Sequence, residues 1–259
     1  MNDVQNQKDS RNIDIQKVGV KNVEIPLVVQ IKPNGTQTVY AKAKMSVSLP
    51  KEYKGTHMSR FIEILEEDRT KGLLGVDIKK LLSKMRDKLG ANSAYAKFDF
   101  KYFVEKSAPK SELKSLMCYD CYFEGIYNDN DYKFYLGAKI PIATLCPCSK
   151  EISKYGAHNQ RATVKVKISY DEDQHIWLED LIKDIEQSGS CELYSLLKRE
   201  DEKTVTENAY DNPKFVEDVL RDVVLKLQNN KIINEFEIEI EAMESIHNHN
   251  AWAYQKFVR

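Results

Sequence analysis

Residues 39–49 have the sequence Val-Tyr-Ala-Lys-Ala-Lys-Met-Ser-Val-Ser-Leu, in which every second residue is apolar. Successive side chains of a β-strand point to opposite faces, so this alternation predicts a strand with one buried and one solvated face. The preceding segment, Val23–Ile31, is apolar and β-branched, and Pro33-Asn34-Gly35 joins the two. Asn-Gly favours a tight turn because both residues tolerate positive φ. The sequence therefore predicts an antiparallel hairpin.

The same kind of pattern continues along the chain and occurs twice. After this hairpin the sequence predicts a helix from Ser59 and a second helix over 78–89, with Gly72 and Gly75 between them and Asp77 at the start of the second. Four strands follow, over 94–104, 116–127, 134–140 and 162–170. The last predicted elements are helices over 178–185 and from Asn212-Pro213, and strands over 236–242 and 251–257. This order predicts an α+β fold of two tandem ββααββ modules, with antiparallel sheets and the helices on one face. We place the modules at residues 23–130 and 131–259, after a polar arm at 1–22 that is expected to be mobile.

Composition excludes several classes of protein. The 259 residues carry 39 Lys+Arg and 40 Asp+Glu, a net charge of -1, which argues against a nucleic-acid binder that works through bulk positive charge. The sequence has no apolar run long enough to span a membrane, and its polar N-terminus does not resemble a signal peptide. We therefore expect a cytoplasmic protein with five reduced cysteines. Open sheet edges in each module also predict an oligomer.

Cysteine and histidine are concentrated around residues 146–158. The pair in Cys146-Pro-Cys148 is too close for the paired ligands of a structural zinc site. One thiol, His158 and a carboxylate would instead make a metal site with an open position, as catalysis requires. The alternative is two buried thiols beside a surface histidine, and the spacing alone does not separate these two interpretations.

A second cluster follows the strand over 236–242. Apolar residues of that strand point inward, and Glu244 continues the inward register. A carboxylate on a buried face is costly unless it is paired or used. His247 and His249 share one parity, which would place two imidazoles side by side, and imidazole suits proton transfer near neutral pH. A solvated turn is the alternative; the inward carboxylate favours a functional role.

Three further features are weaker. His57 and Arg60 lie beside a predicted helix start, where backbone donors and positive charge could hold phosphate. Glu217 lies in the first turn of a helix, which the helix dipole explains on sequence grounds alone. Cys118 and Cys121 are three apart in a predicted strand and so face opposite ways, which indicates free thiols rather than a motif.

Seven blocks of the chain match one known family, in the same order. They are Asp3–Arg11, Gly55–Phe61, Leu145–Ser153, Tyr155–Arg161, Asp201–Glu207, Asn212–Asp218 and Glu244–His249. On these blocks the chain resembles the prokaryotic GTP cyclohydrolases of type IB, the FolE2 family, over essentially its whole length. The resemblance implies the tunnelling fold with two ββααββ modules, and a homotetramer with active sites at subunit interfaces.

The resemblance also implies a reaction. Family members convert GTP and water to 7,8-dihydroneopterin triphosphate and formate, which begins folate biosynthesis and in many bacteria feeds deazapurine tRNA modification. They use a divalent metal, zinc or manganese. Such a metal suits the chemistry because C8 of guanine is a poor electrophile, and a metal lowers the pKa of the attacking water. The resemblance therefore implies that GTP is the binding partner, and we expect the protein to bind neither nucleic acid nor a membrane.

Roles for individual residues follow from the same resemblance. The metal-associated positions are Cys146, His158 and Glu202, with Glu207 as the alternative carboxylate. The proton-transfer positions are Cys148, which could also ligate the metal, Glu244, His247 and His249. Glu217 matches the acid that pairs with the guanine N–H groups, and the residues expected to hold the triphosphate are His57, Arg60, Arg161 and Lys150.

Two other functions share features with this one. A nitrile reductase of the queuosine pathway has the same fold, but it would need a cysteine nucleophile with its own flanking signature and a nicotinamide site. Release of formate without consumption of NADPH would separate the two. A non-enzymatic purine- or pterin-binding module would not need the Cys/His/Glu set, so the metal content of purified protein would distinguish it.

Overall fold

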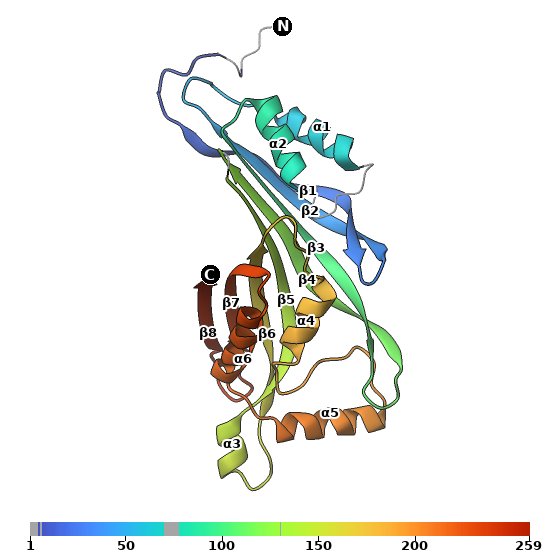
Figure 1. The fold of residues 1–259 in the computed structure, drawn as a ribbon. Helices are drawn as coiled ribbons and strands as arrows, with labels where there is room; N and C mark the ends of the chain where they lie inside the picture. Colours follow the sequence, from blue (N-terminus) through green and yellow to red (C-terminus); the bar gives the residue numbers. More distant parts are fainter. Residues whose placement is uncertain (1–4, 6, 70–77, 130) are drawn as a thin grey trace. The chain divides into compact units, whose positions relative to one another are not determined.

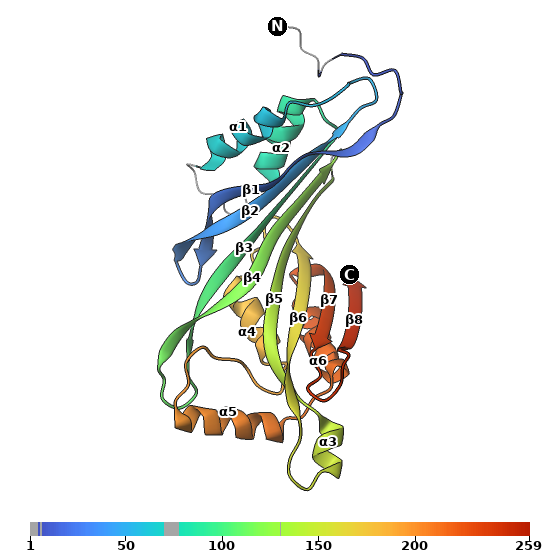
Figure 2. The same cartoon turned by 180° about the vertical axis from the view of Figure 1, so that it is seen from behind.

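The computed structural model describes residues 5, 7–69, 78–129 and 131–259, and in these residues the chain forms an antiparallel sheet with helices (Figures 1 and 2). The strands are β1 (Ile15–Ile31), β2 (Gly35–Leu49), β3 (Ser93–Ser107), β4 (Lys114–Asn128), β5 (Asp131–Leu145), β6 (Asn159–Tyr170), β7 (Ile233–Ala242) and β8 (Ala251–Val258). The helices are α1 (Met58–Arg69), α2 (Ile78–Leu89), α3 (Pro147–Ile152), α4 (Leu178–Glu186), α5 (Arg199–Asp211) and α6 (Val216–Asn229). Hydrogen bonds connect the strands in chain order from β1 to β8. The fold class is therefore α+β, as expected.

Two compact units divide the chain. The first contains Met1–Lys101 and Tyr122–Leu136, and the second contains Tyr102–Cys121 and Gly137–Arg259. Strands β3, β4 and β5 contribute residues to both units, because the division falls within each of them.

In the first unit, α1 and α2 pack against each other and cover the β1–β2 hairpin. The inward residues of β2 are buried from Val39 to Leu49, which confirms the alternation in the sequence. The hairpin closes where Ile31 pairs with Gly35, at the predicted turn. A side chain at Gly125 on β4 would lie 2.4 Å from Ile78 Cγ2, so the absence of a Cβ lets α2 approach the sheet closely.

In the second unit, α6 packs on β7 and β8, and α4 lies beside α6. Residues 236, 238, 240 and 242 of β7 are buried. The glutamates between them face outward, where Glu239 pairs with Lys165 and Glu237 pairs with Lys256. The alternating sequence therefore sets which face of β7 meets the helices.

Several boundaries differ from the sequence prediction. β1 begins at Ile15, so residues 15–22 belong to a strand rather than to the arm. Ser59 lies inside α1 and is not its cap. Pro213 is not at the start of a helix, because α6 begins at Val216 after Phe215 as N-cap. The expected features at Asp3, Gly72, Gly75 and Asp77 lie outside the described residues.

Two helices were not expected at all. α3 follows β5 directly, and α5 fills much of the segment between α4 and α6. The first half of the chain has the order ββααββ, whereas the second half has α3 between β5 and β6 and three helices before β7. Within the described part of the chain, none of the helices has the length and apolar character needed to cross a membrane.

Candidate active site

Cys146 lies where β5 ends and α3 begins. Pro147 occupies the first position of α3, where a missing N–H costs nothing, and Cys146 is the N-cap. Its Sγ accepts a hydrogen bond from Ser149 N at 3.4 Å. Cys146 is half-buried and Cys148, inside α3, is exposed. The local sequence thus holds the first thiol in a defined position and leaves the second one accessible.

Ser149 brings His158 back beside Cys146. Its Oγ donates to Cys146 O at 3.1 Å and accepts from His158 N at 3.2 Å. The backbone N–H of Cys146 also donates to His158 O, at 3.1 Å. The segment from 146 to 158 is therefore closed at its ends, and the thiol and the imidazole belong to neighbouring residues in space although they are 12 positions apart.

The imidazole of His158 begins a hydrogen-bonded chain. Nδ1 lies 2.9 Å from Gln160 Oε1, and Gln160 Nε2 donates to Glu244 Oε1 at 3.0 Å. Ser245 Oγ lies 3.3 Å from the same Nδ1. Glu244 is half-buried just beyond β7, so the expected inward carboxylate is present and it is paired.

His247 and His249 lie together in the loop between β7 and β8. Their rings are stacked, with centroids 5.1 Å apart and planes 17° from parallel. Both are exposed. The expectation of two neighbouring imidazoles is confirmed, although the loop rather than a strand produces the arrangement.

Glu202 lies apart from the thiol and imidazole. It is exposed in the first turn of α5, whereas Lys150 of α3 contacts Tyr210 near the other end of that helix, with Nζ 4.3 Å from the ring centroid. Glu202 and Tyr210 are eight positions apart on the helix, a rise of roughly 12 Å. Across residues 5, 7–69, 78–129 and 131–259, three or more His, Cys, Asp or Glu side chains do not come close enough to hold a metal ion. Glu207, the alternative, is exposed and lies 3.8 Å from Lys203.

The residues present nevertheless fit a metal in their chemistry. His158 uses Nδ1 for a hydrogen bond, which leaves Nε2 to coordinate, and thiolate with imidazole suits zinc.

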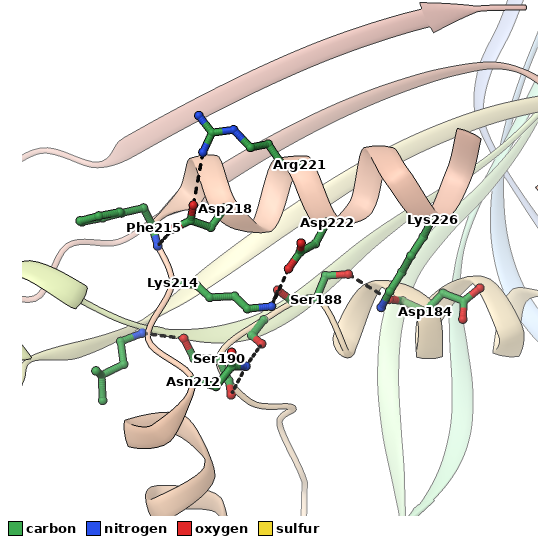
Figure 3. A network of polar contacts seen from close by, with 12 residues as sticks. Asp184, Ser188, Ser190, Asn212, Lys214, Phe215, Asp218, Arg221, Asp222 and Lys226 are labelled. Atoms are coloured by element: carbon green, nitrogen blue, oxygen red, sulfur yellow. Dashed lines mark hydrogen bonds and ion pairs between the residues drawn. The ribbon is translucent and has the colours of Figure 1, made fainter. Parts of the chain in front are cut away.

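Glu217 is exposed in the first turn of α6, and a polar network holds that turn in place (Figure 3). Asp218 Oδ2 accepts from Phe215 N at 3.0 Å, which satisfies one of the free donors at the helix start. Lys214 Nζ donates to Asp222 Oδ2 at 2.6 Å and to Ser188 O at 3.1 Å.

The same segment is tied to the end of β5, directly before Cys146. Asn212 Nδ2 donates to Gly189 O at 3.0 Å and to Ser190 O at 3.2 Å (Figure 3). Lys214 N donates to Leu145 O at 3.0 Å, one residue before Cys146. The start of α6 and the end of β5 therefore lie against each other.

His57 and Arg60 belong to the first unit. Together with Lys88 they line a cavity of about 180 Å³, and Arg60 Nη1 donates to Lys88 O at 2.9 Å. The N-terminal segment reaches the same loop, because Gly55 N donates to Gln5 O at 3.1 Å. Of the other two expected phosphate ligands, Arg161 is exposed beside Met243, and Lys150 lies over Tyr210.

Sequence reasoning missed the residues that hold the site together, namely Ser149, Gln160, Asn212 and Lys214. All four lie inside the quoted sequence blocks. The strand pairing that brings Gln160 near Glu244, with Ala162 opposite Ala242, is seen in the structure and could not be read from the sequence.

Solved structures with a similar fold include a uricase and a urate oxidase. Uricase from Arthrobacter globiformis aligns with a TM-score of 0.54 at 7% identity, over 94% of this chain and 93% of that one. Urate oxidase from Bacillus sp. TB-90 aligns with a TM-score of 0.55 at 8% identity, over 95% of this chain and 100% of that one. At such low identity the likeness shows the fold alone. The class of protein is therefore α+β, with a polar cluster of Cys146, His158, Gln160 and Glu244 where β5 ends, β6 begins and β7 ends.

Sequence comparison identifies the family. The model of the type I GTP cyclohydrolase FolE2 family matches residues 1–253. "GTP cyclohydrolase FolE2" from Syntrophus aciditrophicus is 52% identical over 255 residues, covering 98% of each chain. The protein of the same name from Geobacter sp. strain M21 is 51% identical over 253 residues, covering 98% of this chain and 93% of that one. The chain belongs to the type I GTP cyclohydrolase FolE2 family.

Proposed function

We propose that the chain converts GTP and water to 7,8-dihydroneopterin triphosphate and formate, the first step of folate biosynthesis and a supply for deazapurine tRNA modification. Its membership of the FolE2 family, over residues 1–253, carries this proposal. The reaction opens the imidazole ring of guanine, releases C8 as formate and closes a new ring with ribose carbons. Each stage moves protons, so it needs several groups that exchange protons near neutral pH.

Cys146 and His158 would hold a zinc or manganese ion, with Glu202 as the third ligand. When bound, the ion supplies Lewis acidity that makes water a nucleophile at neutral pH. The neighbouring positions of Cys146 and His158 support this assignment. Glu202 would reach the other two ligands only by a different placement of α5 or from a second copy of the chain, and Glu207 is its rival.

Proton transfer is the role proposed for Glu244, His247, His249 and Cys148. The stacked imidazoles can exchange protons with the purine nitrogens and ribose oxygens. Glu244 lies within the hydrogen-bonded chain of His158. Cys148 is exposed two residues after the N-cap thiol and so can meet substrate or metal.

Glu217 would recognise guanine, because one carboxylate can accept from both N–H groups on that edge of the base. The anchored start of α6 supports this role. His57, Arg60, Arg161 and Lys150 would hold the triphosphate. The net charge of -1 requires that this positive charge be local, and the cavity lined by His57, Arg60 and Lys88 is one such place.

The proposed assembly is a homotetramer of the tunnelling fold with two ββααββ modules per chain and sites at subunit interfaces. Its support is that β1 and β8 are the end strands of the sheet, and β8 exposes Trp252 and Tyr254. We place the enzyme in the cytoplasm, where its five free cysteines stay reduced.

Metal add-back tests the function. Metal-free protein is incubated with GTP, single metals are restored, and the oxidised pterin is followed by fluorescence. Zinc or manganese should restore the signal without NADPH. No pterin with any metal, or consumption of NADPH with a nitrile substrate, would overturn the proposal.

A further inference from the structure

We propose that Gln160 is a positioning residue for His158: its amide links Nδ1 of the imidazole to Glu244, so that Nε2 is the nitrogen presented to a metal ion. The role toward the metal rests on the proposed function, whereas the hydrogen-bonded link itself does not.

The direction of the link follows from the chemistry of its ends. Gln160 turns its NH₂ group toward Glu244, and its Nε2 donates to the carboxylate oxygen Oε1 at 3.0 Å. The amide oxygen then faces His158 Nδ1, at 2.9 Å, and an oxygen there requires a proton on that nitrogen. The neutral ring therefore carries its proton on Nδ1 and leaves a lone pair on Nε2.

Ser245 is consistent with this arrangement. Its Oγ is 3.3 Å from Nδ1, longer than the bond to Gln160, and a hydroxyl oxygen can serve as a second acceptor for the same proton. The tautomer with its proton on Nδ1 can therefore donate to both nearby oxygens, Gln160 Oε1 and Ser245 Oγ.

The strand register explains why these residues meet. β6 and β7 are antiparallel, and their pairing ends with Ala162 opposite Ala242. Met243 N, one residue beyond β7, donates to Arg161 O at 3.0 Å. This bond holds the start of the loop after β7 against β6, next to Gln160, and so brings Glu244 within reach of the Gln160 amide.

A positioning residue of this kind acts in two ways. It removes the alternative tautomer, whose Nε2 carries a proton and cannot coordinate, and it prevents rotation of the ring. Loss of such a partner typically weakens metal binding by roughly 10- to 100-fold. Glu244 would contribute to metal affinity only through Gln160.

The test compares Gln160→Leu with Gln174→Leu, a matched change at an exposed turn. Nitrogen-15 NMR of the metal-free proteins reports the His158 tautomer. We expect the Nδ1–H form in the unaltered chain and in Gln174→Leu, and a mixture or the other tautomer in Gln160→Leu. Zinc affinity, measured against a competing chelator, should fall about 10- to 100-fold in Gln160→Leu only.

An exchanged pair guards against simple misfolding. In Gln160→Glu combined with Glu244→Gln, the carboxylate accepts from Nδ1–H and the amide donates to the carboxylate, so the Nδ1–H tautomer and zinc affinity should be retained. An unchanged tautomer in Gln160→Leu would overturn the link. A changed tautomer with unchanged zinc affinity would overturn its role toward metal. If the unaltered chain binds no zinc, the proposed metal site fails while the NMR result still decides the link.

Discussion

At the scale of single residues, the site is a set of reactive side chains placed by less reactive neighbours. Ser149 joins Cys146 to His158, and Gln160 joins His158 to Glu244. The reactive types could be found from the sequence because cysteine and histidine are scarce and clustered. The neighbouring residues Ser149 and Gln160 could not be found in this way, because serine and glutamine are common. Their roles become visible only where the structure brings the two ends of the 146–158 segment together.

Loss of the N-cap thiol should remove the metal. Cys146→Ser is expected to fold, since the core lies elsewhere, but to retain little zinc or manganese and to release no formate. Cys148→Ser should keep more metal, because that thiol is exposed inside α3. Metal analysis of the purified proteins checks both, and full metal with normal turnover in Cys146→Ser would contradict the site.

The carboxylate ligand is decided by a paired comparison. Glu202→Gln should lose metal, whereas Glu207→Gln, changed in the same way one and a half turns along α5, should keep it. The reverse result would make Glu207 the ligand.

Substrate recognition is tested at Glu217. In Glu217→Gln one oxygen becomes a donor and faces a guanine N–H, so KM for GTP should rise roughly 10- to 100-fold, as expected for loss of a charged hydrogen bond. Discrimination against ATP should fall as well. Steady-state kinetics with both nucleotides, and with Glu112→Gln as an exposed control, measure this. Unchanged GTP kinetics would remove the assignment.

At the scale of elements, alternation and helical spacing predicted the strands and the long apolar helices, since burial enforces those periods. α5 escaped prediction because few of its residues are buried; Asp201 and Ala209 are the buried ones. It is held instead by polar contacts, in which Asp201 accepts from Lys198 N at 2.9 Å and Ser111 Oγ at 2.6 Å. Such tertiary contacts leave no period in a sequence.

Asp201 should make stability depend on pH. Burial alone would raise its pKa, but the hydrogen bonds that it accepts hold the pKa below the ordinary value of 3.8. A depressed pKa in the folded state contributes stability above the unfolded pKa and loses it as pH falls toward the folded value. Asp201→Asn should therefore be less stable at pH 7 and pH 5, by an amount that shrinks below about pH 4. Urea unfolding of both proteins at four pH values measures this difference in the free energy of unfolding. A difference that stayed constant down to pH 3 would contradict the prediction.

A buried ion network joins β3 to the end of α4. Lys106 Nζ lies 2.8 Å from both Glu186 Oε2 and Glu192 Oε2, and Tyr119 donates to Glu186 Oε1 at 2.8 Å. Burial raises the pKa of Glu186, against the opposing effect of Lys106. The network has no place in the proposed chemistry, so its role is structural.

Removing the cation should leave two acids poorly paired. Lys106→Met is expected to lower the free energy of unfolding by about 3–5 kcal/mol, as for other broken buried pairs. Lys114→Met in the same hairpin is the control, because its pair with Glu105 is exposed and should matter little. Denaturant unfolding compares the two, and equal effects would contradict the claim.

At the scale of the whole molecule, the α+β class was predictable from the alternation of residues 39–49 and its later counterparts. The second half departs from a plain ββααββ order because α3 and α5 are added around the candidate site. The assembly remains a prediction. Four copies of a 30.0 kDa chain give a species of about 120 kDa by analytical ultracentrifugation. Trp252→Lys with Tyr254→Lys on β8 should shift it to smaller species, and a 30 kDa unaltered protein would contradict the tetramer.

Formate release is the most direct test of the central claim, which is that this chain opens the imidazole ring of GTP. Metal-reconstituted protein is incubated with GTP, and formate, pterin and remaining GTP are measured together. The predicted result is one formate and one pterin for each GTP consumed, with no NADPH required. Consumption of GTP without formate, or formate without pterin, would contradict it.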